Sequence, residues 1–151
     1  MTIAIDSAQA EDIDALCDLL ALLFAIEQDF RPDRAAQRRG LAMLLAAPER
    51  GRIFVARHPA RGVVGMVSAQ LLISTAIGAP SAWVEDLVLR EDFRQQGLGK
   101  RLLDSARDWA WAQGARRLQL LADADNAPAL AFYRHLAWRP TRLFAWKQSR
   151  D

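Results

Sequence analysis

The chain has few of the residues that disulfide-bonded and metal-binding proteins need. Its 151 residues include a single cysteine, Cys17, which excludes an internal disulfide. The two histidines, His58 and His135, are far apart, and no cluster of cysteine, histidine and carboxylate residues has metal-ligand spacing. We therefore expect no metal site. We interpret Cys17 as a small core residue on the apolar face of a helix.

Long apolar runs and a strong charge of one sign are also missing. No apolar stretch approaches the length of a membrane span, and the first six residues alternate like a strand rather than resembling a secretory signal. The formal net charge is only +2, which is too small to indicate a nucleic-acid partner. These absences predict a soluble, cytoplasmic protein without a nucleic-acid partner or a membrane contact.

What is present suits one globular domain over residues 1–151. Hydrophobic residues make up 52% of the chain, enough for one buried core, and there is no repeat or linker. Asp33 is suited to begin a helix and Gly114 to end one. Periodicity predicts helices over about 10–28, 33–47 and 97–113, and strands over 2–5, 52–57, 63–74, 81–89, 118–122 and 140–147. The sum is a mixed, largely antiparallel sheet with helices on both faces.

The most informative segment is the polar loop between the strand that ends at Leu89 and the helix that follows Gly97 and Gly99. It reads Arg-Glu-Asp-Phe-Arg-Gln-Gln-Gly-Leu-Gly-Lys from residue 90. The first N–H groups of a helix have no intrahelical partner, and the helix dipole is positive there, so anions bind well. Glycine lets a phosphate approach the backbone, and Arg94 and Lys100 add positive charge. This pattern predicts a pyrophosphate site.

Two better-known phosphate loops do not fit this segment. A Walker loop needs Ser or Thr after Gly-Lys, but Arg101 follows Lys100. A dinucleotide fingerprint needs a third glycine where Leu102 stands. What remains is Arg-x-x-Gly-x-Gly between a strand and a helix. The alternative is a glycine-rich turn that only caps the helix.

A second segment supplies Asn126, Ala129, Phe132 and Tyr133 after the strand at 118–122. Together, the loop and this segment resemble the GNAT superfamily of N-acetyltransferases, and the resemblance runs from the first strand to about Trp146. It implies an α/β fold with a mixed, largely antiparallel central sheet, helices on both faces and a splayed parallel strand pair. It also implies acetyl-CoA as cosubstrate. The chain departs from the family pattern at Ala137, where glycine is usual and alanine meets a steric cost at positive φ.

The resemblance implies a set of cofactor-binding residues. The pantetheine arm would pair with the main chain of one strand, like an added strand, although two of its leucines can equally be plain core residues. The pyrophosphate would bind the loop, and the segment after the splayed strand would complete the site. These residues are Leu87, Val88 and Leu89, then Arg94, Gln95, Gln96, Gly97, Leu98, Gly99 and Lys100, then Asn126, Ala129 and Phe132.

The chemistry needs a group that removes a proton from the amine and one that protonates the thiolate. Tyr133 matches the family's general acid, and the alternative is a packing ring beside Phe132. Glu85 is the candidate base, acting through water, because a carboxylate in an apolar strand needs a reason. Strand alternation puts Glu85 on the face of Trp83, Leu87 and Leu89, with Asp86 opposite. The alternative for Glu85 is a structural salt bridge.

The acceptor is expected to be a small primary amine, which attacks the acetyl group of the cosubstrate directly. Glu27, Asp29 and Phe30, at the end of the first helix, and Asp86 are the candidate substrate-binding residues, forming an acidic and aromatic pocket for a cation. A solvated helix end is the plainer reading of the first three. Three other functions stay open: a non-catalytic acyl-CoA sensor, a protein or peptide N-acetyltransferase, and a phosphate-binding module unrelated to acetyl transfer. A homodimer is one alternative for the assembly.

Overall fold

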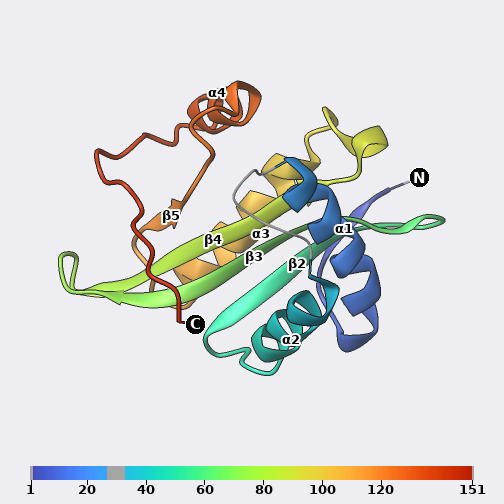
Figure 1. The fold of residues 1–151 in the computed structure, drawn as a ribbon, viewed down its shortest axis with the longest axis horizontal. Coiled ribbons are helices and arrows are strands. Elements are labelled where there is room, and N and C mark those ends of the chain that lie inside the picture. Colours follow the sequence, from blue (N-terminus) through green and yellow to red (C-terminus); the bar gives the residue numbers. More distant parts are fainter. Residues whose placement is uncertain (1, 27–32, 151) are drawn as a thin grey trace. The chain divides into compact units, whose positions relative to one another are not determined.

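The computed structural model describes residues 2–26 and 33–150 (Figure 1). These residues form two compact units, 1–121 and 122–151, which are treated separately below. One domain over the whole chain stays a prediction.

The first unit holds a five-stranded sheet in the order β1-β2-β3-β4-β5. All neighbours pair antiparallel except β4 and β5, which are parallel. Helices α1 and α2 cover one face and α3 covers the other (Figure 1). The predicted fold class is confirmed. The elements are β1 Ala4–Ser7, the 3-10 helix η1 Ala10–Asp12, α1 Ile13–Ile26, α2 Arg34–Leu45, β2 Gly51–His58, β3 Gly62–Ser74, β4 Ala79–Leu89, the 3-10 helix η2 Glu91–Phe93, α3 Leu98–Ala112 and β5 Leu118–Leu120.

Helix α3 follows directly from its sequence. Its apolar positions recur with the helical period, and the predicted stripe is buried: Leu98, Leu102, Ala106, Trp109 and Ala110. The helix ends at Gly114, whose φ of 89° is easy only for glycine. Helix α2 begins as predicted, since the Asp33 carboxylate accepts a hydrogen bond from the N–H of Ala36 at 3.1 Å.

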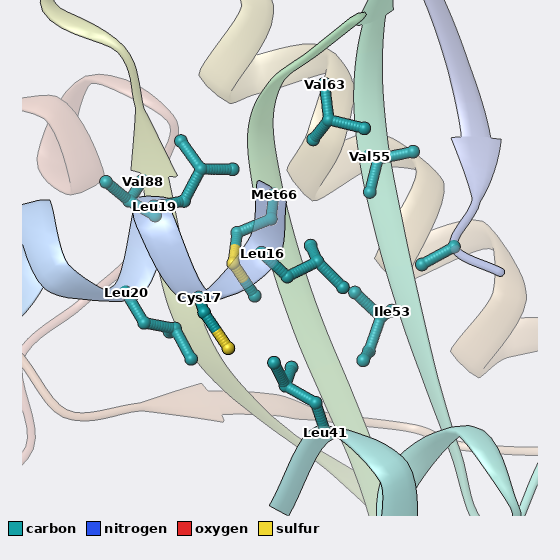
Figure 2. Packing of buried hydrophobic residues seen from close by; sticks show 11 residues of the cluster. Leu16, Cys17, Leu19, Leu20, Leu41, Ile53, Val55, Val63, Met66 and Val88 are labelled. Carbon is teal, nitrogen blue, oxygen red and sulfur yellow. The ribbon is translucent and has the colours of Figure 1, made fainter. Parts of the chain in front are cut away.

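The core on the other face lies between α1 and the sheet (Figure 2). Leu16 and Leu19 point from α1 towards Met66 and Val88 of the sheet. Cys17 lies in this core as expected, and burial raises the pKa of its thiol. The thiol is therefore a packing group rather than a nucleophile.

A β-bulge interrupts β4 near its C-terminal end. Met66 pairs with Val88 and Ser68 pairs with Glu85, so Asp86 and Leu87 together face the single residue Val67. Asp86 takes a φ of 58°, which is uncommon for a residue other than glycine.

The bulge corrects part of the predicted alternation along β4. Met66 and Ser68 lie on one face of β3, so their partners Val88 and Glu85 share a face. Leu89 lies on the opposite face: a Cβ on Gly65 would be 2.3 Å from Leu89 Cδ2 and 3.4 Å from Leu102 of α3. The expectation that Leu89 shares the face of Glu85 is wrong, because the extra residue reverses the alternation.

The second unit contains α4, Ala127–His135. Ala137 follows with a φ of 68°, the strained position noted in the sequence. The strand predicted over 140–147 is wrong, because residues 139–150 form no helix or strand. Apolar residues give this segment strand propensity, but a strand forms only with a hydrogen-bonded neighbour. Phe144 and Trp146 are 85% and 94% exposed.

A buried ion pair joins η1 to β2. The Arg57 guanidinium donates two hydrogen bonds to the Asp12 carboxylate, at 3.0 and 3.1 Å, and the Gln9 N–H donates a third at 2.8 Å. The bond from Arg57 lowers the pKa of Asp12, whose side chain is only 7% exposed. The ionised carboxylate therefore stabilises the fold above its unfolded pKa of about 4, and this contribution is lost as the pH falls through the lower folded value.

We expect Asp12→Asn to lower the free energy of unfolding by about 2–4 kcal/mol at pH 7, because Arg57 loses its buried partner. The deficit should shrink towards pH 3. Urea unfolding at both pH values measures it. Asp14→Asn is the control: Asp14 is 74% exposed and pairs with Arg38, so its loss should cost less than about 1 kcal/mol. Equal losses for the two variants would contradict the prediction.

Candidate active site

The loop between β4 and α3 presents main-chain N–H groups in a row. Gln95 and Gly97 both take positive φ values, 60° and 77°, and alternation of this kind turns successive N–H groups towards one side. Among the residues described, the first main-chain hydrogen bond of α3 runs from the Arg101 N–H to the Gly97 carbonyl at 3.1 Å. The N–H groups of residues 98–100 therefore begin the helix without an intrahelical acceptor. This geometry can bind an anion.

Side chains fix this loop in place. Phe93 is buried, and the Arg61 guanidinium lies 5.4 Å from its ring centre while bonding Asp92 at 3.1 Å. Arg94 donates through Nε to the Leu89 carbonyl at 3.2 Å, and Gln96 donates to the Asp92 carbonyl at 3.2 Å. Contacts within the chain therefore hold the loop in shape.

Space and charge at the loop suit a phosphate group. A Cβ added at Gly97 would meet no atom within 4 Å, so the surface above the loop is open. Lys100 forms an exposed ion pair with Asp104 at 2.7 Å, so part of its charge is compensated. The N–H groups of the helix start carry no such compensation and are the fixed donors for an anion.

The pairing of β4 with β5 is short. It joins Ala82 to Leu118, Trp83 to Gln119 and Val84 to Leu120, and stops there. The edge of β4 beyond Val84 lies outside this ladder, as expected for a splayed parallel pair. The main-chain groups of this edge can pair with an extended ligand.

A cavity of about 870 Å³ opens between helices α1 and α2 and the sheet, within the first unit. Its lining is largely apolar, with leucines from both helices and from β3. Three of the described residues that line it carry charge: Arg50, Glu85 and Asp86. Its polar or aromatic lining also includes Phe24, Gln37, Ser68, Gln70 and Trp83.

Glu85 is exposed to this cavity and is oriented by a neighbour. The Trp83 Nε1–H donates to its Oε1 at 2.7 Å, and the Ser68 hydroxyl donates to its main-chain carbonyl at 3.2 Å. Trp83 therefore shares the face of Glu85, as predicted. No arginine or lysine of the described chain forms an ion pair with Glu85, so the salt-bridge alternative has no partner there.

The remaining predicted acceptor residues divide into two groups. Asp86 was expected on the face opposite Glu85, but both residues line the same cavity. Glu85 is the last regularly paired residue before the bulge, and Asp86 belongs to the bulge, where simple alternation does not hold. Glu27, Asp29 and Phe30 lie outside the described residues. Phe24, the aromatic residue expected beside them, does line the cavity.

The second unit carries the other predicted site residues. The Asn126 side chain caps α4 by accepting a hydrogen bond from the Ala129 N–H at 3.2 Å. The partly buried Tyr133 ring packs edge-on against Phe132 and Trp138, with centroids 5.3 and 5.8 Å apart. Tyr133 thus combines a packing role with a phenol group.

Sequence reasoning missed several cavity residues. Trp83 could have been found, because its spacing of two from Glu85 puts both side chains on one strand face. Ser68 and Gln70 have the same spacing on β3, but nothing singled them out. Arg50 stands in a turn, and nothing in the sequence pattern indicated a role for it.

No helix in the described parts of the chain is long and apolar enough to cross a membrane.

Comparison with solved structures shows the same fold in several acetyltransferases. Glucosamine-6-phosphate N-acetyltransferase from Arabidopsis thaliana superposes with a TM-score of 0.79 at 16% identity, covering 98% of this chain and 99% of that one. An aminoglycoside N-acetyltransferase in complex with CoA gives 0.83 at 17%, covering 99% and 96%. The same enzyme with a bisubstrate analogue gives 0.81 at 18%, covering all of both chains. A search of curated proteins found no match.

The sequence comparison goes further than the fold. The profile of the acetyltransferase (GNAT) family matches residues 13–138. This span includes the β4–α3 loop, the cavity residues of β3 and β4, and α4. The chain belongs to the acetyltransferase (GNAT) family.

Proposed function

We propose that the protein is an acetyl-CoA-dependent N-acetyltransferase that acts on a small primary amine. The observation that carries the proposal is the β4–α3 loop, which in a member of an acetyltransferase family offers free N–H groups beneath open space at Gly97. The aminoglycoside enzyme with the same fold was crystallised with CoA.

The loop residues 94–100 fit a pyrophosphate, because the N–H groups of a helix start are fixed donors and the helix dipole favours negative charge. The edge of β4 at Leu87, Val88 and Leu89 lies beyond its pairing with β5 and suits an extended pantetheine arm, which would bond to main-chain groups and compete with Arg94 for the Leu89 carbonyl. Asn126, Ala129 and Phe132 remain proposed cofactor-binding residues, as the family resemblance implies.

Glu85 and Tyr133 carry the proposed proton transfers. A primary amine has a pKa of about 10 and must lose a proton to attack. Glu85 accepts that proton through a water molecule, and the neutral nitrogen then bonds to the thioester carbonyl carbon. The C–S bond breaks, Tyr133 donates its phenolic proton to the departing thiolate, and the second proton that the nitrogen loses returns to the tyrosinate through solvent. Acetyl-CoA supplies only the acetyl group and the thiolate leaving group.

The cavity supports a cationic amine as the acceptor. Among the described residues its lining includes two carboxylates, Glu85 and Asp86, and one cation, Arg50, so an ammonium group is favoured near β4. The leucines and Trp83 give an apolar wall for the body of the acceptor. Glu27, Asp29 and Phe30 are proposed to border the same acceptor.

We expect Gly97→Glu to weaken acetyl-CoA binding at least about tenfold, because a carboxylate there repels the pyrophosphate and fills its space. Titration calorimetry with acetyl-CoA measures the dissociation constant. Gly78→Glu is the matched control. Gly78 also has a positive φ, 65°, and no atom within 4 Å of an added Cβ, but it lies in the β3–β4 turn.

Both variants place a glutamate at a positive φ, so a difference between their acetyl-CoA dissociation constants measures the effect of the substitution on the binding site. Unchanged acetyl-CoA affinity in a folded Gly97→Glu protein would reject the loop as the cofactor site. If acetyl-CoA binds but no amine in a broad panel releases thiol, the chain is an acyl-CoA sensor.

A further inference from the structure

One hydrogen bond in the cavity is not explained by packing. The Trp83 indole N–H reaches Glu85 Oε1 at 2.7 Å, and both residues line the cavity from the same face of β4. Trp83 is partly buried, whereas Glu85 is exposed. A carboxylate free to turn through its rotamers is thus tied to a ring that packing restrains.

The bond leaves the carboxylate half occupied. An indole is a donor only, so it can never take a proton from Glu85 or give one up at ordinary pH. It occupies Oε1 and leaves Oε2 to accept a proton from water or an amine. Hydrogen bonds to ionised groups are stronger than neutral ones, so the contact can select one rotamer of the side chain.

The backbone of Glu85 is fixed at the same point. The Ser68 hydroxyl bonds the Glu85 carbonyl at 3.2 Å, directly before the bulge. Both the main chain and one carboxylate oxygen of Glu85 are therefore positioned by neighbours on β3 and β4. In the described part of the chain, the other charged residues that line this cavity are Asp86 and Arg50.

We propose that Trp83 is a positioning residue for the transfer reaction, which aims Glu85 Oε2 at the acceptor amine through its own bond to Oε1. The inference rests on the proposed role of Glu85 as the base. The proposed role depends on the indole N–H group, which donates the hydrogen bond, and an aromatic ring without that group cannot perform it.

Trp83→Phe removes the N–H and keeps an aromatic wall. We expect kcat/KM for the amine to fall about 10–100-fold, the range for a lost hydrogen bond to a charged group, with KM for acetyl-CoA unchanged. In a Glu85→Gln background the same change should alter the rate less than about twofold, because the base is already gone. Trp111→Phe, on the exposed side of α3, is the control and should keep full activity.

A spectroscopic measurement tests the contact without any turnover. In a ¹H–¹⁵N spectrum the indole signal that disappears in Trp83→Phe identifies Trp83. That signal should move upfield in Glu85→Ala, where its acceptor is absent. A signal that stays in place, or a Trp83→Phe effect of equal size with and without Glu85, would overturn the inference. A wild-type protein that acetylates no amine would instead reject the proposed function, while the spectra still test the contact.

Discussion

Tyr133→Phe is expected to lower kcat by about 10²–10⁴-fold, the usual loss when a general acid is removed. The variant keeps the ring and therefore its contacts with Phe132 and Trp138. It loses only the phenolic proton, so KM for acetyl-CoA should change little. Steady-state thiol release with a reactive amine measures both constants.

Trp138→Phe is the control for packing around Tyr133. It trims the ring on one side of Tyr133 and leaves the phenol in place, so turnover should stay within a few-fold of wild type. Thermal unfolding of both variants checks that the fold persists. A Tyr133→Phe protein with near-normal kcat would assign Tyr133 to packing and leave water as the acid.

Glu85→Gln should lower kcat/KM for the amine by about 10²–10³-fold, because a neutral amide cannot accept the proton. The rise of the rate with pH should flatten, whereas acetyl-CoA affinity in calorimetry should persist. An amide oxygen can still accept the bond from Trp83, so the local structure changes little. A pH series of kcat/KM for wild type and variant measures the effect.

Glu11→Gln makes the same change of charge at an exposed site in η1 and should leave the rate and its pH profile as they are. If Glu85→Gln lowers the stability of the protein but leaves the pH profile of kcat/KM unaltered, Glu85 is not the base. A panel of diamines, amino sugars, amino acids and peptide N-termini then tests the acceptor. Preference for an anionic acceptor would reject the cationic-amine proposal.

The loop and α3 could be predicted because their determinants are local. Glycine at position 97 and an apolar residue every third or fourth position act within a few residues, and neither needs a partner from elsewhere. Asp33 and Gly114 were predicted for the same reason. The antiparallel strands β2 to β4 were also recovered, within one or two residues at their ends.

Features that depend on distant partners could not be predicted. The bulge is a property of how β3 and β4 pair, and simple alternation along β4 contains no sign that Asp86 and Leu87 share one partner. Residues 140–147 have the composition of a strand but no strand pairing in the described chain. The cavity gathers Arg50, Gln70 and Trp83 from three separate segments, which a single pattern cannot connect.

The bulge in β4 also separates strand positions that tolerate substitution from positions that do not. On one side of it Val88 packs into the core with Met66, and on the other Trp83 and Glu85 face a cavity that packing does not fill. Gln70 is exposed and lines this cavity, so its substitution should change the cavity wall at little cost to folding. Deletion of one residue from β4 would move the side chains on one side of the deletion to the opposite face of the sheet. Val88 could then no longer pack in the core while Trp83 and Glu85 line the cavity. A library aimed at new acceptors should vary side chains on this strand and preserve its length.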